Sequence, residues 1–203
     1  MGRKPRGNAP SRGRKGKLLP RLTPDEGAGV LRSLLDRHPE LVAEAEDLAR
    51  ATVNDVDACG VAEDVEQAVL DLDVDELGTR AGRTRWGYVE PSEAAWELLD
   101  EALDRFLEEM KRHIELGFEA AAIETCAGIV LGLYRCRDKS SDRLLSWAED
   151  FPAETAGHAI ATLARESAAK HRRSWRLPDA IVDQVPEWAD WIGRASNPAS
   201  GSR

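Results

Sequence analysis

Cysteines, aromatic residues and long apolar runs are scarce in this 203-residue chain, in which only 5% of residues are aromatic. The three cysteines are odd in number and widely spaced: Cys59, Cys126 and Cys136. We therefore expect reduced thiols and a cytoplasmic location. The longest apolar run before Thr23 is Leu18-Leu19, which predicts no signal peptide. No segment approaches the roughly 20 apolar residues of a membrane span, so we expect no membrane partner.

The motifs of common enzyme and metal sites are also missing. No G-x-S-x-G motif, phosphate loop or dinucleotide fingerprint occurs, so we expect a non-enzymatic protein without a cofactor. The histidines and cysteines form no C-x-x-C, H-x-x-x-H or H-E-x-x-H pattern, which predicts no zinc site. Asp71, Asp73 and Asp75 alternate like the start of a calcium loop, but Glu76 and Gly82 stand where that loop requires glycine and glutamate.

Charge is divided unevenly along the chain, whose formal net charge is -9. Residues 1–21 contain no acid, and their basic residues are Arg3, Lys4, Arg6, Arg12, Arg14, Lys15, Lys17 and Arg21. Residues 22–203 therefore hold 20 Lys or Arg against 37 Asp or Glu, a net charge of -17. We expect this acidic body to repel nucleic acid and anionic lipid, which only the basic tail could attract.

The basic tail allows two interpretations. Arg12-Gly13-Arg14 resembles the core of the AT-hook, although Lys15 stands where that motif has proline. Flexible cations at Arg3 to Lys17 could bind phosphates by releasing counterions; alternatively, the tail increases solubility or lies on the acidic surface of its own chain. We expect residues 1–22 and 195–203 to be disordered, because they offer little apolar surface to bury, and residues 23–194 to form one helical domain.

Apolar periodicity predicts an all-α fold of antiparallel helix hairpins, stacked as a solenoid or a bundle. Thr23 to Glu26 combines an N-cap hydroxyl, proline at the first helical position and glutamate three residues after the cap. The apolar stripe of this first helix is Val30, Leu31, Leu34 and Leu35. We expect helices at about 23–38, 39–52, 62–72, 75–80, 92–116, 118–135, 142–149, 153–171 and 179–193, the last interrupted near Pro186. No segment shows the alternation typical of a strand.

The clearest pattern begins at Ser92, which we interpret as a helix cap. Apolar residues then recur at steps of three and four as far as Ile114, and Gly117 is expected to end the helix. The exposed face carries two i,i+4 pairs, Glu101–Arg105 and Glu108–Arg112.

The following helix, about 118–135, is apolar all round from Cys126 to Tyr134. It is therefore predicted to be the innermost helix, with Gly128 and Gly132 allowing a neighbour to approach closely. A thiol at Cys126 in such a setting is expected to be inert.

The stretch RAGRTRWGYVEP, residues 80–91, combines three arginines, two aromatic residues and two glycines. As a binding loop it would stack its aromatic rings on bases or a peptide while its arginines held phosphates. As a connector it would reverse the chain at its glycines and anchor its rings on the core. We favour the connector and retain a possible partner contact at Arg80, Arg83, Arg85, Trp86 and Tyr88.

The segment from Gly87 to Tyr134 consists of a Gly-aromatic-Val-acidic loop, a long acidic helix, a glycine hinge and an Ala/Leu-rich helix. This order of elements resembles the helical region of bacterial SWIM-zinc-finger proteins and of related uncharacterised bacterial helical proteins. The C-x-C and C-x-H ligand pairs of that finger are absent. The resemblance therefore implies a bacterial helical-repeat-like scaffold and carries over no zinc or DNA binding.

These observations predict a non-enzymatic helical scaffold or protein-interaction module, which offers a groove between hairpins to another protein. The alternative is a nucleic-acid-associated protein that engages through its basic tail.

Overall fold

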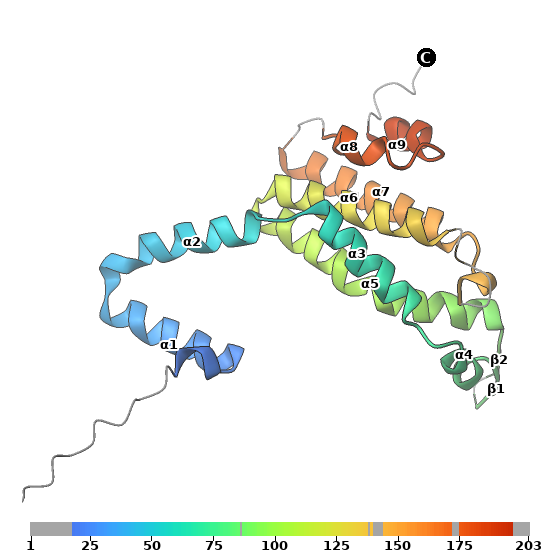
Figure 1. The fold of residues 1–203 in the computed structure, drawn as a ribbon, viewed down its shortest axis with the longest axis horizontal. Coiled ribbons are helices and arrows are strands. Elements are labelled where there is room, and N and C mark those ends of the chain that lie inside the picture. Colours follow the sequence, from blue (N-terminus) through green and yellow to red (C-terminus); the bar gives the residue numbers. More distant parts are fainter. Residues whose placement is uncertain (1–17, 86, 138, 140–143, 172–174, 197–203) are drawn as a thin grey trace, which may run out of the picture. The chain divides into compact units, whose positions relative to one another are not determined.

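The computed structural model of the chain describes residues 18–85, 87–137, 139, 144–171 and 175–196 (Figure 1). It divides into two units, Met1–Ala49 and Arg50–Arg203. The described fold is all-α, as the sequence predicts, apart from one two-stranded hairpin. Most of the two segments predicted to be disordered lies outside the described residues.

The first unit contains a 3-10 turn, Leu19–Arg21, helix α1, Pro24–Arg37, a second 3-10 turn, Pro39–Leu41, and the start of α2, Val42–Asn54. α1 begins where the sequence predicts, with a full capping box: the Glu26 backbone N–H donates to Thr23 Oγ1 at 3.3 Å, and the Thr23 N–H donates to Glu26 Oε2 at 2.9 Å. The apolar stripe predicted for this helix, at residues 30–35, is not buried, because α1 contains no buried residue.

The second unit contains all other elements: α3 Ala58–Leu70, α4 Val74–Arg80, β1 Gly82–Thr84, β2 Gly87–Val89, α5 Pro91–Leu116, α6 Glu119–Cys136, a 3-10 turn Leu144–Trp147, α7 Phe151–His171, α8 Asp179–Val182 and α9 Ala189–Ser196. α6 packs on α3, α5 and α7, and these four helices lie side by side in Figure 1. The unit is a helical bundle.

α6 is the central helix, as predicted, and every residue from Thr125 to Tyr134 is buried. Its glycines let α3 approach: a Cβ added at Gly128 would lie 2.5 Å from Val61 Cβ, and one at Gly132 would lie 2.7 Å from the Ala62 carbonyl oxygen. Cys126 is fully buried, and desolvation raises the pKa of its thiol to about 12. This thiol is therefore unsuited to nucleophilic chemistry.

Several helix bounds differ from the prediction: α2 begins at Val42 after a 3-10 turn, α7 begins at Phe151, and a 3-10 turn, Leu144–Trp147, is described where a helix at 142–149 is predicted. α3 begins at Ala58 instead of residue 62, because the Asp57 carboxylate caps it by accepting from the backbone N–H groups of Cys59 at 3.3 Å and Gly60 at 2.9 Å. α5 begins at Pro91 with Glu90 in the N-cap position, so Ser92 lies inside the helix and is not its cap. Gly117 ends α5 as predicted, with φ +82° in the left-handed region.

The exposed ion pairs on α5 also differ from those predicted. Glu101 pairs with Arg80 of α4 through two hydrogen bonds of 2.6 and 2.7 Å, and Arg112 pairs with Glu109 at 2.7 Å. Sequence spacing favours i,i+4 partners, whereas the fold brings α4 against α5 and supplies a bidentate partner for Glu101.

The connection between α8 and α9 packs on the end of α6, and α9 packs on α7. The Tyr134 ring lies edge-on to Trp188, with 5.1 Å between ring centroids, and the Arg137 guanidinium lies 3.5 Å from the centroid of the Tyr134 ring. Arg137 also donates to Glu187 at 2.7 Å. Among the described residues, no helix is long and apolar enough to cross a bilayer.

Candidate functional site: a groove between helices α5 and α7

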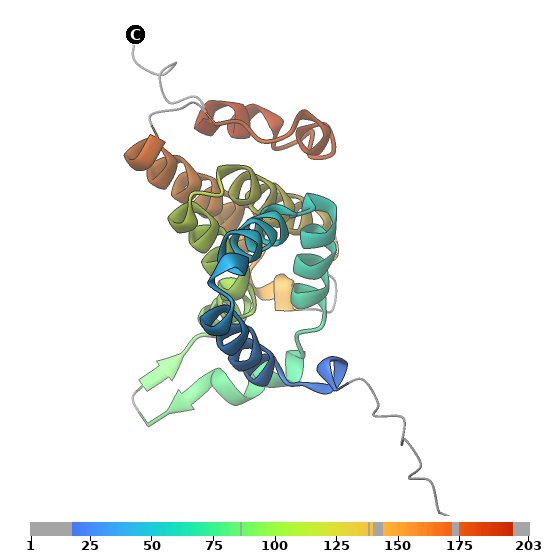
Figure 2. The ribbon, with the colours of Figure 1, turned by 90° about the vertical axis from the view of Figure 1, so that its left-hand side faces the viewer.

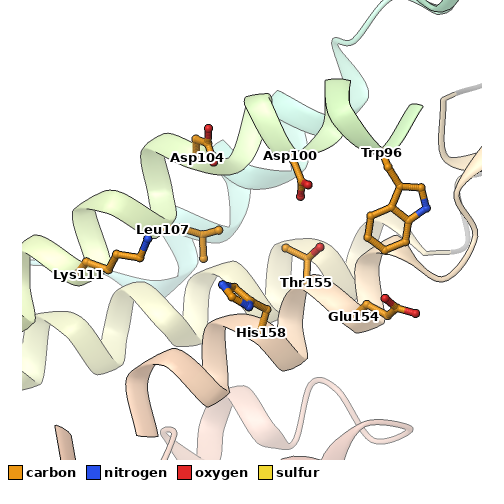
Figure 3. Close-up of a pocket in the computed structure, with 8 residues that line it drawn as sticks. All are labelled: Trp96, Asp100, Asp104, Leu107, Lys111, Glu154, Thr155 and His158. Carbon is orange, nitrogen blue, oxygen red and sulfur yellow. The ribbon is translucent and has the colours of Figure 1, made fainter. Parts of the chain in front are cut away.

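One face of α5 presents polar and apolar side chains toward the start of α7. The α5 residues occur at steps of three or four, so the helical period places them on one face: Trp96, Asp100, Asp104, Leu107 and Lys111. α7 contributes Glu154, Thr155 and His158. Together they line a groove of about 570 Å³, in which Asp100 and Leu107 extend from α5 toward α7 and His158 extends from α7 toward α5 (Figure 3).

Trp96 is fixed at one end of this groove by the core. Its ring packs edge-on against Phe151, with 4.9 Å between centroids and 71° between ring planes. Phe151 is fully buried at the first position of α7. The indole is therefore held in one place while part of it borders the groove.

The groove carries an excess of negative charge. Among the described residues, none forms an ion pair with Asp100, Asp104 or Glu154. Lys111, which lines the far end, pairs with Glu108 at 2.8 Å. The carboxylates of the groove are thus available to a cation.

The excess negative charge of the groove contributes to a raised pKa at Asp100. Desolvation raises the pKa of the Asp100 carboxyl above its ordinary value, the negative charge of Asp104 raises it further, and His158 acts in the opposite direction. A cationic group bound beside Asp100 would relieve the repulsion between the two carboxylates.

Of the site residues predicted from the sequence, those that the structure describes do not line this groove. The seven tail cations, Arg3, Lys4, Arg6, Arg12, Arg14, Lys15 and Lys17, fall outside the described residues. Of the stretch at residues 80–91, Arg80 is bound to Glu101, while Arg83 and Tyr88 occupy paired positions of the β1–β2 hairpin. The two strands of this hairpin are the two arrows in Figure 2. Trp86 is outside the described residues, and Arg85 is exposed.

The hairpin gives the local reason for the two glycines in that stretch. Gly82 and Gly87 have φ values of +100° and +148°, which favour glycine. Tyr88 is 62% exposed, so its ring is not buried in the core as a connector anchor would be. A partner contact at this hairpin stays a prediction.

Within the described part of the chain, no group of three or more His, Cys, Asp or Glu side chains is arranged to hold a metal ion. Comparison with protein-family models, curated proteins and solved structures finds no match. The resemblance of residues 87–134 to SWIM-associated helical regions stays a prediction.

Sequence reasoning missed the acidic groove. Trp96 and Leu107 belong to the apolar residues that recur at steps of three and four before Ile114, and the structure shows both only partly buried. The available signal was the like-charge pair Asp100 and Asp104 at i,i+4 spacing, which disfavours an isolated helix.

Proposed function

We propose that this chain is a non-enzymatic helical protein-interaction module whose α5–α7 groove binds a lysine- or arginine-bearing segment of another protein. The observation that carries the proposal is the set of three carboxylates, Asp100, Asp104 and Glu154, which have no ion-pair partner in the described part of the chain and lie beside a tryptophan fixed by the core.

The groove provides two kinds of contact for such a segment. The carboxylates accept charge-assisted hydrogen bonds, and a guanidinium can take two of them at once. The partly exposed Trp96 ring offers its face to the same cation or to the apolar stem of its side chain. A space of about 570 Å³ is sufficient for a long side chain and its flanking backbone.

Specificity in this arrangement comes from position more than from net charge. Leu107 separates the acidic part of the groove from Lys111, whose charge disfavours a second cation at that end. The bound segment should therefore carry its basic residue at the Trp96 end and an apolar residue near Leu107.

The double variant Asp100→Asn, Asp104→Asn is expected to weaken binding of a capped peptide containing one arginine and one leucine by about tenfold. Each exposed ion pair contributes at most about 1 kcal/mol, and the loss of two such contacts corresponds to about tenfold in affinity. Isothermal titration calorimetry of the full chain would measure the affinity. The matched control is Glu93→Gln, Glu115→Gln, which removes the same charge from α5 outside the groove.

Replacing the arginine of that peptide by citrulline keeps its shape but removes its charge, and should have the same effect as the double variant. An equal loss of affinity in the groove variant and in the control variant would contradict the proposal. Such a result would show that the peptide is attracted non-specifically by an acidic surface.

The second candidate function is nucleic-acid association through the tail, which the eight basic and no acidic residues of positions 1–21 favour. The full chain is expected to bind immobilised DNA at low salt and to be released as salt rises, because counterion release makes phosphate binding steeply salt-dependent. A chain that starts at Leu22 should pass through the same column. Equal retention of the two chains would rule out the tail as the binding element.

A further inference from the structure

A second pocket, separate from the α5–α7 groove, lies within the Arg50–Arg203 unit where the α2–α3 connection, α3, α5 and α6 meet. Its volume is about 570 Å³, within the range typical of small-molecule sites. Its apolar wall is formed by Val53, Val56, Val61 and Phe106. This combination suits a small molecule with an apolar body.

The charged groups around this pocket are nearly all of one sign. Asp55, Asp57, Asp64 and Glu109 line it, and no lysine or arginine in the described part of the chain does. The Asp57 carboxylate is engaged in capping α3, but among the described residues none forms an ion pair with Asp55 or Asp64. An anionic ligand is therefore disfavoured and a cationic one favoured.

A buried histidine lies in the wall of the pocket. His113 is 3% exposed, and its Nδ1 lies 3.2 Å from Thr125 Oγ1. The Thr125 hydroxyl has a single proton and donates it to the Ala121 carbonyl oxygen at 2.8 Å. While Thr125 donates to this carbonyl oxygen it can only accept from His113, and this arrangement requires the tautomer with the ring proton on Nδ1.

This assignment leaves the other ring nitrogen facing an acceptor. His113 Nε2 lies 3.2 Å from Glu109 Oε1, and in the neutral imidazole Nε2 has a lone pair and no proton. Desolvation lowers the pKa of His113 below its ordinary value, although Glu109 acts in the opposite direction, so the neutral form prevails near pH 7. In this tautomer two acceptors lie 3.2 Å apart in the pocket wall, and a donor placed between them would relieve their repulsion.

We propose that this pocket binds a small apolar molecule carrying one protonated primary amine, whose ammonium group donates to both His113 Nε2 and the Glu109 carboxylate. An ammonium has three donors and no acceptor, so it satisfies both groups at once and is attracted by Asp64. Its apolar body lies against Phe106 and Val61. The chemical class is an aryl- or alkyl-ammonium ion.

The proposal makes binding dependent on pH, because the ligand and a proton compete for His113 Nε2. The charged groups around His113 are Glu109 and Arg112 on α5, Asp55 and Asp57 in the α2–α3 connection and Asp64 on α3, while α6 lines the pocket only with the uncharged Thr125. Of these types of group, only the imidazole has an ordinary pKa between about pH 5 and 8. Affinity should therefore rise as pH rises through the pKa of His113.

The test is a titration of the full chain with 2-phenylethylammonium, followed through the NMR signals of the histidine Cε1–H groups. Because the ligand prefers the neutral ring, it is expected to lower the pKa of His113 further, by about one unit for a tenfold preference between the two forms. The His38 signal, in the other unit, should not move. An unchanged His113 titration overturns the proposal.

Two comparisons separate the ammonium contact from other causes. Glu109→Gln should weaken binding by about tenfold, whereas Glu108→Gln, a neighbour outside the pocket, should leave it unchanged. 2-Phenylethanol, which lacks the charge, should bind at least about tenfold more weakly. Equal affinities in either comparison overturn the proposal, and a shift of His158 alone would place the ammonium in the α5–α7 groove instead.

Discussion

Gly132→Leu is expected to destabilise the Arg50–Arg203 unit by about 1 to 3 kcal/mol or more, because the added side chain has no space beside α3. A Cβ at this position would lie 2.7 Å from both the Ala62 carbonyl oxygen and Val65 Cβ. The first of these is a backbone atom, so relief requires α3 to move as a whole. Denaturant unfolding followed by tryptophan fluorescence would measure the loss, since all six tryptophans follow Arg50.

The matched control compares alanine at two helical glycines. Gly157→Ala on α7 places its Cβ in open space and should stabilise by about 0.5 to 1 kcal/mol through helix propensity. Gly132→Ala gains the same propensity and should still destabilise, because the Cβ alone makes the close contact. Opposite signs are the expected result, and stabilisation by both substitutions would show that α3 does not pack closely on α6.

The sequence was sufficient to predict the parts of the fold that depend on local signals. Three such signals arise from residues within one or two helical turns. They are the capping box at Thr23, the left-handed conformation of Gly117 and the apolar run of α6. The start of α3 was missed because the cap at Asp57 lacks the acid three residues later that marks a capping box. The three-residue strands β1 and β2 are too short to produce a periodic pattern.

The sites depend on residues that only the tertiary fold brings together. Asp100 on α5 and His158 on α7 lie far apart in the sequence, and no local pattern predicts that they border one groove. The same holds for Glu101, whose partner is Arg80 of another helix. Spacing rules describe neighbours on one helix, and they do not predict which faces of two helices will meet.

The two sites also differ in how the fold supports them. The α5–α7 groove is open and acidic, so its contacts are screened by solvent and salt. His113, by contrast, is buried between α5 and α6 with both ring nitrogens facing polar atoms. We therefore expect ionic strength to affect peptide binding in the groove more than amine binding at His113.

Phe151→Ala should lower the free energy of unfolding by about 3 to 5 kcal/mol, because it removes a fully buried ring and leaves a cavity. It should also weaken peptide binding in the α5–α7 groove, since the Trp96 ring loses the partner that packs 4.9 Å from its centroid. Phe151→Leu keeps most of the volume and should cost less than about 1.5 kcal/mol, while still removing the aromatic contact. Comparing stability and peptide affinity in both variants separates the role of Phe151 in the core from its role in positioning Trp96.

The control is Trp147→Ala, which removes an even larger ring shortly before Phe151 in the chain. Trp147 is 49% exposed, so its loss should leave a smaller cavity and cost clearly less stability than Phe151→Ala. It should leave peptide affinity unchanged, because Trp147 does not line the groove. If the two alanine variants unfold at the same denaturant concentration, Phe151 is not a core residue. If Phe151→Leu binds the arginine peptide as tightly as the wild-type protein, Trp96 keeps its position without the aromatic contact.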